Sequence, residues 1–463
     1  MTKLITDQDA AATPIHAVTP EEWPGLRARL GQAARNYAES IGFEPKAGRH
    51  LLLPGATGRL EAVLFIEDMA KTEGQRAFAR GGLAGLVPAG RYRFAEARPA
   101  AALAALAWLG ELYRFDAYRK KESGPNPELA VPADLDARRI ERMAAAIAFG
   151  RDLVNTPAND LAPDGLERAA RELGSMFGAS VEATVGDALL AKNLPIIHAV
   201  GRASATAPRL IDLSWGDPAA PKVTLIGKGV CFDTGGLDIK TSSGMLLMKK
   251  DMGGAAAALA AARMVMAEGL PVRLRLLVPA VENAISGNAF RPGDILKSRK
   301  GLSVEIGNTD AEGRLILADA LALADEEAPA LIADFATLTG AARTALGPDL
   351  PAFYATDDAF AAEIVETGLR INDPVWRLPF WRPYDEMLAS RVADLNNVAG
   401  SPFAGSISAA LFLKRFVEKA AIYAHFDLYA WNPQSRPGRP QGGETQVARL
   451  IFEAIARRFG KGA

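Results

Sequence analysis

The sequence predicts an α/β protein of two domains: a small N-terminal α/β domain and a larger C-terminal α/β domain with a mostly parallel central sheet covered by helices. Three observations predict it. A chain of 463 residues exceeds the usual size of one domain. After residue 150, short apolar runs alternate with alanine-rich stretches, as in a parallel sheet covered by helices. A polar segment rich in turn formers, residues 120–127, is the best candidate linker. We therefore expect an N-terminal domain with its linker at residues 1–130 and a catalytic domain at residues 131–463.

The N-terminal part has the elements of a small α/β domain but no catalytic pattern. Apolar runs at residues 51–53 and 62–66 predict strands, and residues 100–113 predict a helix. The next helix is predicted over residues 134–153 and ends before Asn155-Thr156-Pro157.

The C-terminal part supplies the alternating strands and helices. Buried strands are predicted at residues 223–226, 274–278, 331–338 and 422–429, and an alanine-rich helix ends at Glu268. Ligands of open α/β sheets bind at the carboxyl ends of the strands, so we expect the site there.

Composition excludes several classes of protein. A formal net charge of −1 gives no bulk attraction for nucleic acid or for a membrane surface. The single cysteine, Cys231, excludes an internal disulfide and suits a reducing compartment. Asp319, Asp325 and Asp334 interrupt the longest apolar candidates, and the N-terminus has no signal-peptide pattern. We expect a cytoplasmic protein with no membrane partner and no nucleic-acid partner.

The most informative segment is NTDAEGRL at residues 308–315. If the segment is extended, Asp310 and Glu312 point to the same side, with Arg314 close enough to hold an anion beside them. Two adjacent carboxylates repel each other unless one is protonated or a cation lies between them. A metal ion is therefore one interpretation. The alternative is an acidic loop followed by a helix whose first turn is negative, which the helix dipole also favours.

A second cluster of ionisable side chains lies upstream. The segment at residues 225–236 predicts a buried strand that runs into a glycine-rich turn, and it contains Lys228 and Asp233. Lys240 and Asp251 follow within 20 residues of it. All are expected at strand ends or helix starts.

Together these segments resemble the cytosolic leucyl aminopeptidases. The NTDAEGRL signature is complete, and so is the GKGxxFDxGG segment, apart from Thr234 where that family more often has serine. The resemblance covers about residues 145–430. The C-terminal run at residues 438–446 differs from the small-residue, glycine-rich ending typical of the family, which places the preference for leucine in question.

The resemblance implies a metal-dependent aminopeptidase that removes an N-terminal leucine or similar apolar residue from peptides, through a hydroxide bridged by two metal ions. The ions would be Zn²⁺ or Mn²⁺, with Mg²⁺ as an alternative, and their ligands would be Lys228, Asp233, Asp251, Asp310 and Glu312. Lys228 ligates only as a neutral amine, which burial and nearby dications favour.

By the same resemblance, Lys240 stays charged and stabilises the tetrahedral intermediate, and Arg314 holds a bicarbonate that acts as general base. The alternatives are a solvated loop lysine and an arginine paired with a first-turn carboxylate. The substrate pocket would be lined by Met248, Thr337, Leu338 and Gly340. Met248 could equally be ordinary core. The resemblance also implies a homohexamer.

Two other functions stay open. A two-metal phosphoesterase would use a carboxylate-rich site, but the four histidines are scattered and show no metal-binding spacing. A non-catalytic role in assembly or DNA binding finds no support in the near-neutral charge.

Overall fold

The computed structural model describes residues 4–6, 11–119 and 126–460 of the chain. The chain divides into two compact units. The first unit comprises residues 1–148, 369–372 and 434–441, and the second comprises residues 149–368, 373–433 and 442–463. Residues 120–125 of the predicted linker lie outside the described residues, and the domain boundary at residues 130 and 131 stays a prediction.

In its described part, the first unit contains a six-stranded sheet in the order β1-β6-β5-β2-β4-β3. All neighbouring strands are parallel except β3 and β4. The strands are β1 (Ile5–Thr6), β2 (Thr13–Val18), β3 (His50–Pro54), β4 (Leu60–Ile66), β5 (Arg91–Phe94) and β6 (Glu128–Val131). The helices are α1 (Trp23–Arg29), α2 (Gln32–Ser40), α3 (Glu73–Gly81), η1 (Gly82–Gly85) and α4 (Ala101–Glu111). The predicted strands at residues 51–53 and 62–66 and the predicted helix at residues 100–113 are confirmed.

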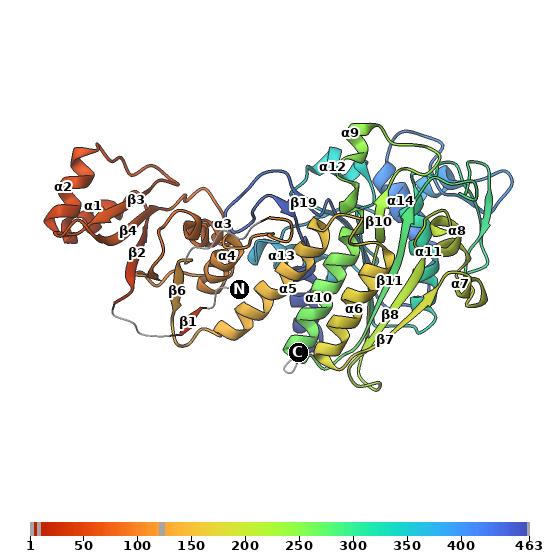
Figure 1. Ribbon diagram of the computed structural model, residues 1–463, viewed down its shortest axis with the longest axis horizontal. Coiled ribbons are helices and arrows are strands. Elements are labelled where there is room, and N and C mark those ends of the chain that lie inside the picture. Colours follow the sequence, from red (N-terminus) through yellow and green to blue (C-terminus); the bar gives the residue numbers. More distant parts are fainter. Residues whose placement is uncertain (1–3, 7–10, 120–125, 461–463) are drawn as a thin grey trace. The chain divides into compact units, whose positions relative to one another are not determined.

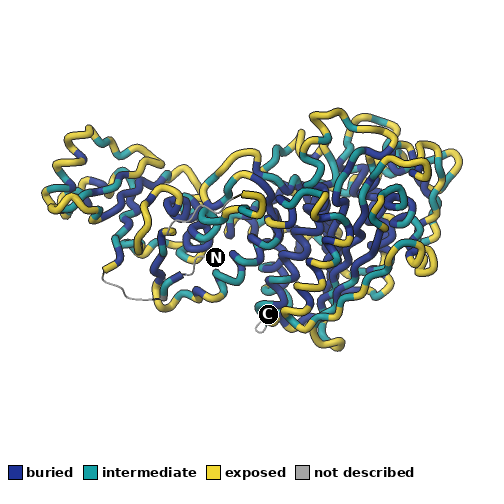
Figure 2. Tube along the Cα trace, viewed as in Figure 1, coloured by how far each residue is buried: buried dark blue, intermediate teal, exposed yellow. Residues whose placement is uncertain are grey.

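The second unit is built on a nine-stranded sheet, counted over the described residues, with the order β16-β15-β18-β14-β9-β11-β8-β7 and β10 paired to β11. Its strands are β7 (Ser180–Val185), β8 (Arg209–Trp215), β9 (Lys222–Gly227), β10 (Gly229–Asp233), β11 (Arg273–Asn283), β14 (Leu331–Ala336), β15 (Ala352–Ala355), β16 (Trp376–Arg377) and β18 (Tyr423–Asp427). Strands β18, β14, β9, β11 and β10 are mutually parallel, as the sequence predicts. Figure 2 shows these central strands buried along their length.

Helices cover both faces of this sheet. In Figure 1, α6 and α10 lie on one face, and α8, α11 and α14 lie on the other. The longer helices are α5 (Ala137–Asn155), α6 (Pro163–Phe177), α8 (Pro195–Gly201), α10 (Gly253–Glu268), α11 (Glu312–Asp325), α13 (Asp358–Arg370), α14 (Gly405–Lys414) and α15 (Ala448–Phe459). Helix α10 is the predicted alanine-rich helix, and it is buried almost all round because it packs between the sheet and α15.

Short elements complete the second unit. The helical ones are α7 (Ala188–Ala191), α9 (Ser242–Met245), η2 (Met248–Met252), α12 (Gly340–Leu346) and η3 (Arg382–Leu388). The remaining strands are β12 (Ile295–Lys297), β13 (Ser303–Glu305), β17 (Leu395–Asn396), β19 (Trp431–Asn432) and β20 (Gly442–Gly443). None of the helices in the described ranges has the length and apolar character that crossing a membrane requires.

The aspartates that interrupt the apolar runs are buried and hydrogen-bonded. Asp319 on α11 accepts hydrogen bonds from the backbone N–H groups of Ile196 and Ile197 at the start of α8, at 2.8 and 3.3 Å. Asp325 accepts the N–H groups of residues 418–420. Asp334 binds Tyr423 and His425. These carboxylates satisfy buried donors and fix α11 and β14 against their neighbours.

Candidate metal centre

The predicted site residues converge at the carboxyl ends of the parallel strands. Asp233 is the last residue of β10, and Lys228 lies between β9 and β10. Asp251 lies in η2, and Asp310 lies directly before α11, which Glu312 begins. A cavity of about 590 Å³ is lined by Lys228, Asp233, Lys240, Met248, Asp251, Asp310, Arg314, Thr337, Leu338 and Gly340, which are all the predicted site residues except the buried Glu312.

Lys228 lies at the centre of the buried part of the cluster. Its Nζ lies 2.8 Å from Asp251 Oδ2 and 3.0 Å from Glu312 Oε1, and it donates to the carbonyl oxygen of Thr337 at 2.9 Å. Burial alone would lower the pKa of Lys228, but Asp251, Glu312 and Asp233 raise it above its ordinary value. The amine is therefore an ammonium while it serves as the counter-ion of these carboxylates.

Gly313 makes room for this lysine. A Cβ at Gly313 would lie 2.5 Å from Cε and 2.6 Å from Nζ of Lys228. Any side chain there would displace the lysine or push α11 away from the sheet. The glycine of the predicted motif is thus a packing requirement of the site.

Lys240 bridges the more exposed half of the cluster. Its Nζ lies 2.8 Å from Asp233 Oδ2 and also contacts Asp310 Oδ1. Burial acts to lower the pKa of Lys240, and both carboxylates together raise it above its ordinary value. These contacts exclude the alternative that Lys240 is a solvated loop residue.

The carboxylates of Asp233, Asp310 and Glu312 approach one another closely. One oxygen from each lies within 4.8 Å of the others. Burial, followed by repulsion from Asp233, raises the pKa of Glu312 to about 8 and that of Asp310 to about 6. Burial also raises the pKa of Asp251, against the effect of Lys228.

These residues fit divalent cations. Buried carboxylates with raised pKa values are short of positive charge, and carboxylate oxygens are the ligands that hard divalent cations prefer. Lys228 could join such a ligand set only as a neutral amine, so binding would release its proton and replace its ion pairs.

The local conformation of the NTDAEGRL segment differs from the extended strand that we assumed. Thr309 and Asp310 form a turn, and Glu312 and Arg314 lie in the first turn of α11. The turn is fixed by Asp238, whose Oδ2 accepts the N–H of Thr309 at 2.8 Å. Asp310 and Glu312 still converge. The bend brings their two carboxylates together, whereas in a strand the alternation of side chains would have done so.

Arg314 is buried beside the carboxylates. Its Nη1 donates to the carbonyl oxygen of Asn397 at 2.8 Å, and its buried Nε has no partner among the described residues. Burial lowers the pKa of Arg314 to about 10, opposed by Glu312 and Asp427, so the side chain stays charged at neutral pH. Within the described part of the chain, Arg314 forms no ion pair with a carboxylate of the first turn. The structure therefore does not show the alternative in which this arginine pairs with such a carboxylate.

Asn283 is a site residue that the sequence reading missed. It is the last residue of β11 and fully buried. Its Nδ2 donates to Asp233 Oδ1 at 2.8 Å and to the carbonyl oxygen of Thr309 at 3.1 Å, and it lies 3.4 Å from Glu312 Oε2. The strand predicted at residues 274–278 ends five positions before Asn283, so the sequence marked this residue only as a polar side chain beyond an apolar run.

Replacement of Asn283 should therefore weaken the metal site without removing a ligand. Asn283→Ala is expected to lower the affinity for divalent metal about 10- to 100-fold, as observed for groups that orient metal ligands. Activity at saturating metal should largely recover. Metal titration of activity, with the exposed Asn288→Ala as control, checks this. An unchanged metal affinity would contradict the orienting role of Asn283.

Asp427, the last residue of β18, fixes the segment after β14. Its Oδ1 accepts the N–H groups of Leu338 and Thr339, each at 3.1 Å, and its Oδ2 accepts the hydroxyl of Thr339 at 2.6 Å. Thr337 donates its hydroxyl to Asp251 Oδ1 at 2.8 Å. These bonds hold the predicted pocket residues Thr337 and Leu338 against the cavity. Met248 is half-buried at the start of η2 and not part of a strand.

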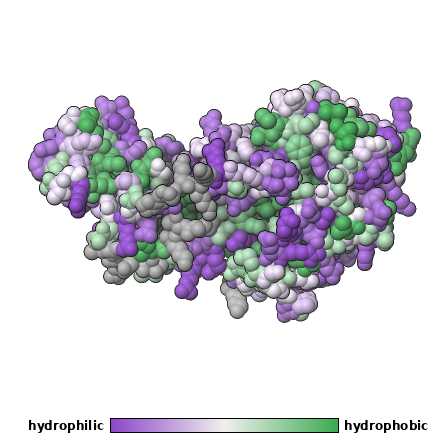
Figure 3. Space-filling view, viewed as in Figure 1, coloured by the Kyte–Doolittle hydropathy of each residue, from purple (hydrophilic) through white to green (hydrophobic). Residues whose placement is uncertain are grey.

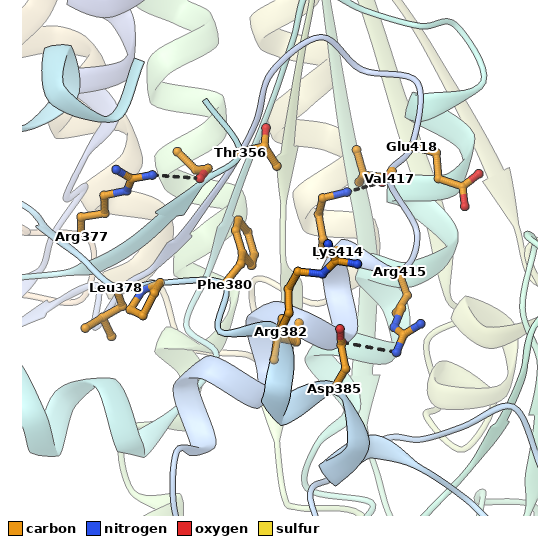
Figure 4. Close-up of a pocket in the computed structure, with 13 residues that line it drawn as sticks. Thr356, Arg377, Leu378, Phe380, Arg382, Asp385, Lys414, Arg415, Val417 and Glu418 are labelled. Carbon is orange, nitrogen blue, oxygen red and sulfur yellow. Dashed lines mark hydrogen bonds and ion pairs between the residues drawn. The ribbon is translucent and has the colours of Figure 1, made fainter. Parts of the chain in front are cut away.

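A second, larger cavity holds none of the predicted site residues. It measures about 980 Å³, and Figure 4 shows Arg377, Arg382, Lys414 and Arg415 around it. Arg415 pairs with Asp385 at 3.3 Å, and Lys414 donates to the carbonyl oxygen of Val417 at 2.8 Å. It has no cluster of carboxylates, so we place the chemistry in the smaller cavity.

Comparison with known proteins agrees with this geometry. Residues 148–452 match the model of the cytosol aminopeptidase family, catalytic domain, and residues 13–132 match that of the M17 aminopeptidase N-terminal domain. The probable cytosol aminopeptidase of Syntrophotalea carbinolica is 39% identical over 360 residues, which cover 74% of this chain and 72% of the relative. The probable cytosol aminopeptidase of Chlamydia abortus is 43% identical over 331 residues, which cover 68% of this chain and 66% of the relative.

Solved structures give the same result over nearly the whole chain. The cytosol aminopeptidase of Coxiella burnetii is 45% identical, has a TM-score of 0.93, and the match covers 98% of this chain and 99% of that one. The bottromycin maturation enzyme BotP in complex with Mn is 33% identical and has a TM-score of 0.85. The match covers 96% of this chain and 99% of that one.

Clustered carboxylates and lysines at the carboxyl edge of an α/β sheet form a site that suits a metal-dependent hydrolase. The two family matches and the relatives specify it further: the chain belongs to the cytosol aminopeptidase family. It is a metal-dependent enzyme that acts on the N-terminus of peptides. The recognition of the family, the α/β fold and the reaction class from sequence are confirmed.

Proposed function

We propose that this aminopeptidase removes an N-terminal leucine or another apolar residue of similar size, with two divalent ions held by Lys228, Asp233, Asp251, Asp310 and Glu312. The observation that carries the proposal is that Lys228 and three of these carboxylates line one cavity and that the buried Glu312 lies against them. Four carboxylates match the charge of two divalent ions. The catalytic domain is proposed to span residues 131–463.

The ions are proposed to be Zn²⁺ or Mn²⁺, with Mg²⁺ as the alternative, since all three accept oxygen ligands. The manganese in the BotP structure supports a metal of this kind. Two such ions supply an activated water and polarise the scissile carbonyl. The protein's part is to orient the ligands, which Asn283 does through its hydrogen bond to Asp233.

Lys240 is proposed to stay protonated and to donate to the oxyanion of the tetrahedral intermediate. Its raised pKa and its position on the cavity wall support this role, because a fixed positive donor stabilises developing charge. Arg314 is proposed to hold a bicarbonate as general base. Its unpartnered Nε and its place on the cavity lining support an oxyanion there.

The side chain of the N-terminal residue is proposed to lie against Met248, Thr337, Leu338 and Gly340, which line the same cavity. A flexible, apolar methionine favours medium-sized apolar side chains.

Leucine release from Leu-Gly tests the proposed function. Metal-stripped protein should be inactive, added Mn²⁺ or Zn²⁺ should restore cleavage, and N-acetyl-Leu-Gly should stay uncut because it lacks the free amine. Cleavage of the acetylated peptide, or activity that survives exhaustive chelation, would refute it.

We also propose a cytoplasmic location and a homohexamer. Leu237, Ile239 and Leu246 are 40%, 58% and 79% exposed, on both sides of Lys240. Figure 3 shows hydrophobic side chains on the upper surface of the second unit. Apolar side chains that gather on one face, rather than their number, support self-association. Sedimentation equilibrium that finds only monomers would contradict the hexamer.

A further inference from the structure

Two cations on the wall of the active-site cavity make no ion pair with the cluster of carboxylates. Lys250, in η2, and Arg343, in α12, both line this cavity. Lys250 is only 5% exposed, whereas Arg343 is exposed. Across the described ranges of the chain, neither side chain has a carboxylate within ion-pair distance.

Both cations contact the same aromatic ring. Lys250 Nζ and the guanidinium carbon of Arg343 each lie 4.9 Å from the centroid of Tyr429, which also lines the cavity. A cation–π contact attracts each cation to the ring but does not neutralise either one. Two positive charges on one ring also repel each other, so the arrangement is short of an anion.

The rest of the cavity does not supply that anion. Lys228 contacts Asp251 and Glu312, and Lys240 contacts Asp233 and Asp310. Each of the four carboxylates therefore already contacts a lysine, and in the proposed function all four bind metal. A lysine this deeply buried is rarely left without a partner in a folded protein. A ligand that enters the cavity can supply this partner.

We propose that Lys250 and Arg343 form a carboxylate-binding subsite, so that the enzyme favours peptides with a carboxylate close to the scissile bond. The inference rests on the proposed function and concerns which peptides that function acts on. The carboxylate has two sources: the side chain of an N-terminal glutamate or aspartate, or the free C-terminus of a dipeptide. An ammonium and a guanidinium bind a carboxylate through charge-assisted hydrogen bonds, and the ring of Tyr429 keeps the two groups in place.

Matched substrates on the metal-loaded enzyme test the subsite. One pair, glutamyl- and glutaminyl-p-nitroanilide, differs only in the side-chain charge. The other pair, Leu-Gly and Leu-Gly-amide, differs only in the C-terminal charge. The variants are Lys250→Met and Arg343→Gln. Arg382→Gln is the control, because Arg382 is exposed and lines the other cavity (Figure 4).

Each variant is expected to lower the ratio of kcat/KM, charged over neutral substrate, by about 10- to 100-fold in one of the two pairs, which is the effect of losing one hydrogen bond to a charged group. The control should not change it. A response of the glutamyl pair assigns the subsite to the N-terminal side chain, and a response of the Leu-Gly pair assigns it to the dipeptide terminus.

Unchanged ratios in both pairs would overturn the subsite. This includes an equal loss of kcat/KM for charged and neutral substrates, which is what a purely structural role predicts. Arg343 is exposed, so its variant should fold even if Lys250→Met does not. If the wild type cleaves no peptide with any metal, the proposed function fails. In that case the affinities of L-glutamate and L-glutamine are compared by calorimetry in the wild type and in Arg343→Gln. A preference for glutamate that the variant loses would still support the subsite, and equal affinities in both proteins would overturn it.

Discussion

Glu312→Gln is expected to reduce kcat for Leu-Gly by about 1000-fold or more at saturating Mn²⁺. The substitution keeps the shape of the side chain and removes one of the buried negative charges that the metal ions require. Metal ions contribute several kcal/mol of transition-state stabilisation, and each 1.36 kcal/mol corresponds to a tenfold change in rate. The measurement is leucine release alongside the bound metal per chain, determined by plasma mass spectrometry.

Glu326→Gln is the matched control for this variant. Glu326 caps the other end of the same helix, where it is exposed and paired with Arg299. Its substitution should leave both activity and metal content within a factor of two of wild type. If Glu312→Gln retained full metal content and wild-type kcat, Glu312 would have to be removed from the ligand set.

The raised pKa of Glu312 leads to a second prediction, which concerns the stability of the metal-stripped protein. The pKa of Glu312 is raised to about 8 from an ordinary value of 4.5, so the folded state binds the proton more tightly than the unfolded state. Its contribution to stability is complete below about pH 4.5 and is lost as the pH rises through about 8. In EDTA, the melting temperature should therefore fall between pH 5 and pH 9. Glu312→Gln should flatten that fall; an unchanged slope would show that other groups cause it.

The sequence predicted the parts of the site that are held by local patterns. Lys228 and Asp233 lie at strand ends that the apolar runs already marked, and Arg314 lies in a motif too dense in charge to be ordinary surface. The central parallel strands and the alanine-rich helix α10 could be located because their burial dictates long apolar runs. The predictions of individual ligand roles remain to be tested.

What the sequence did not reveal depends on contacts between distant segments. Asn283 reaches Asp233 across 50 positions, and Asp427 reaches Leu338 across 89. The bend at Thr309 depends on Asp238, 71 positions away, so the extended geometry assumed for that segment could not have been corrected locally. The sequence did not single out Lys250, since its burial against Tyr429 depends on how η2 packs beside the end of β18.

Lys240→Met should reduce kcat about 100- to 1000-fold, the usual cost of removing one donor to a developing oxyanion. The KM for Leu-Gly and the bound metal per chain should stay close to wild type, because methionine fills the same volume and the carboxylates of Asp233 and Asp310 remain. The exposed Lys192→Met is the control, expected to change neither quantity.

Lys228→Met is expected to behave differently, although both lysines form a pair of salt bridges to carboxylates of the cluster. Lys228 is buried and proposed as a ligand, so its loss should lower metal affinity, and activity should recover only at high metal concentration. Lys240 lines the open side of the cavity, where the substrate carbonyl must lie, so added metal should not rescue its variant. If both variants lost metal and activity in parallel, Lys240 would act as a counter-ion of the metal ligands, and another donor would have to stabilise the oxyanion.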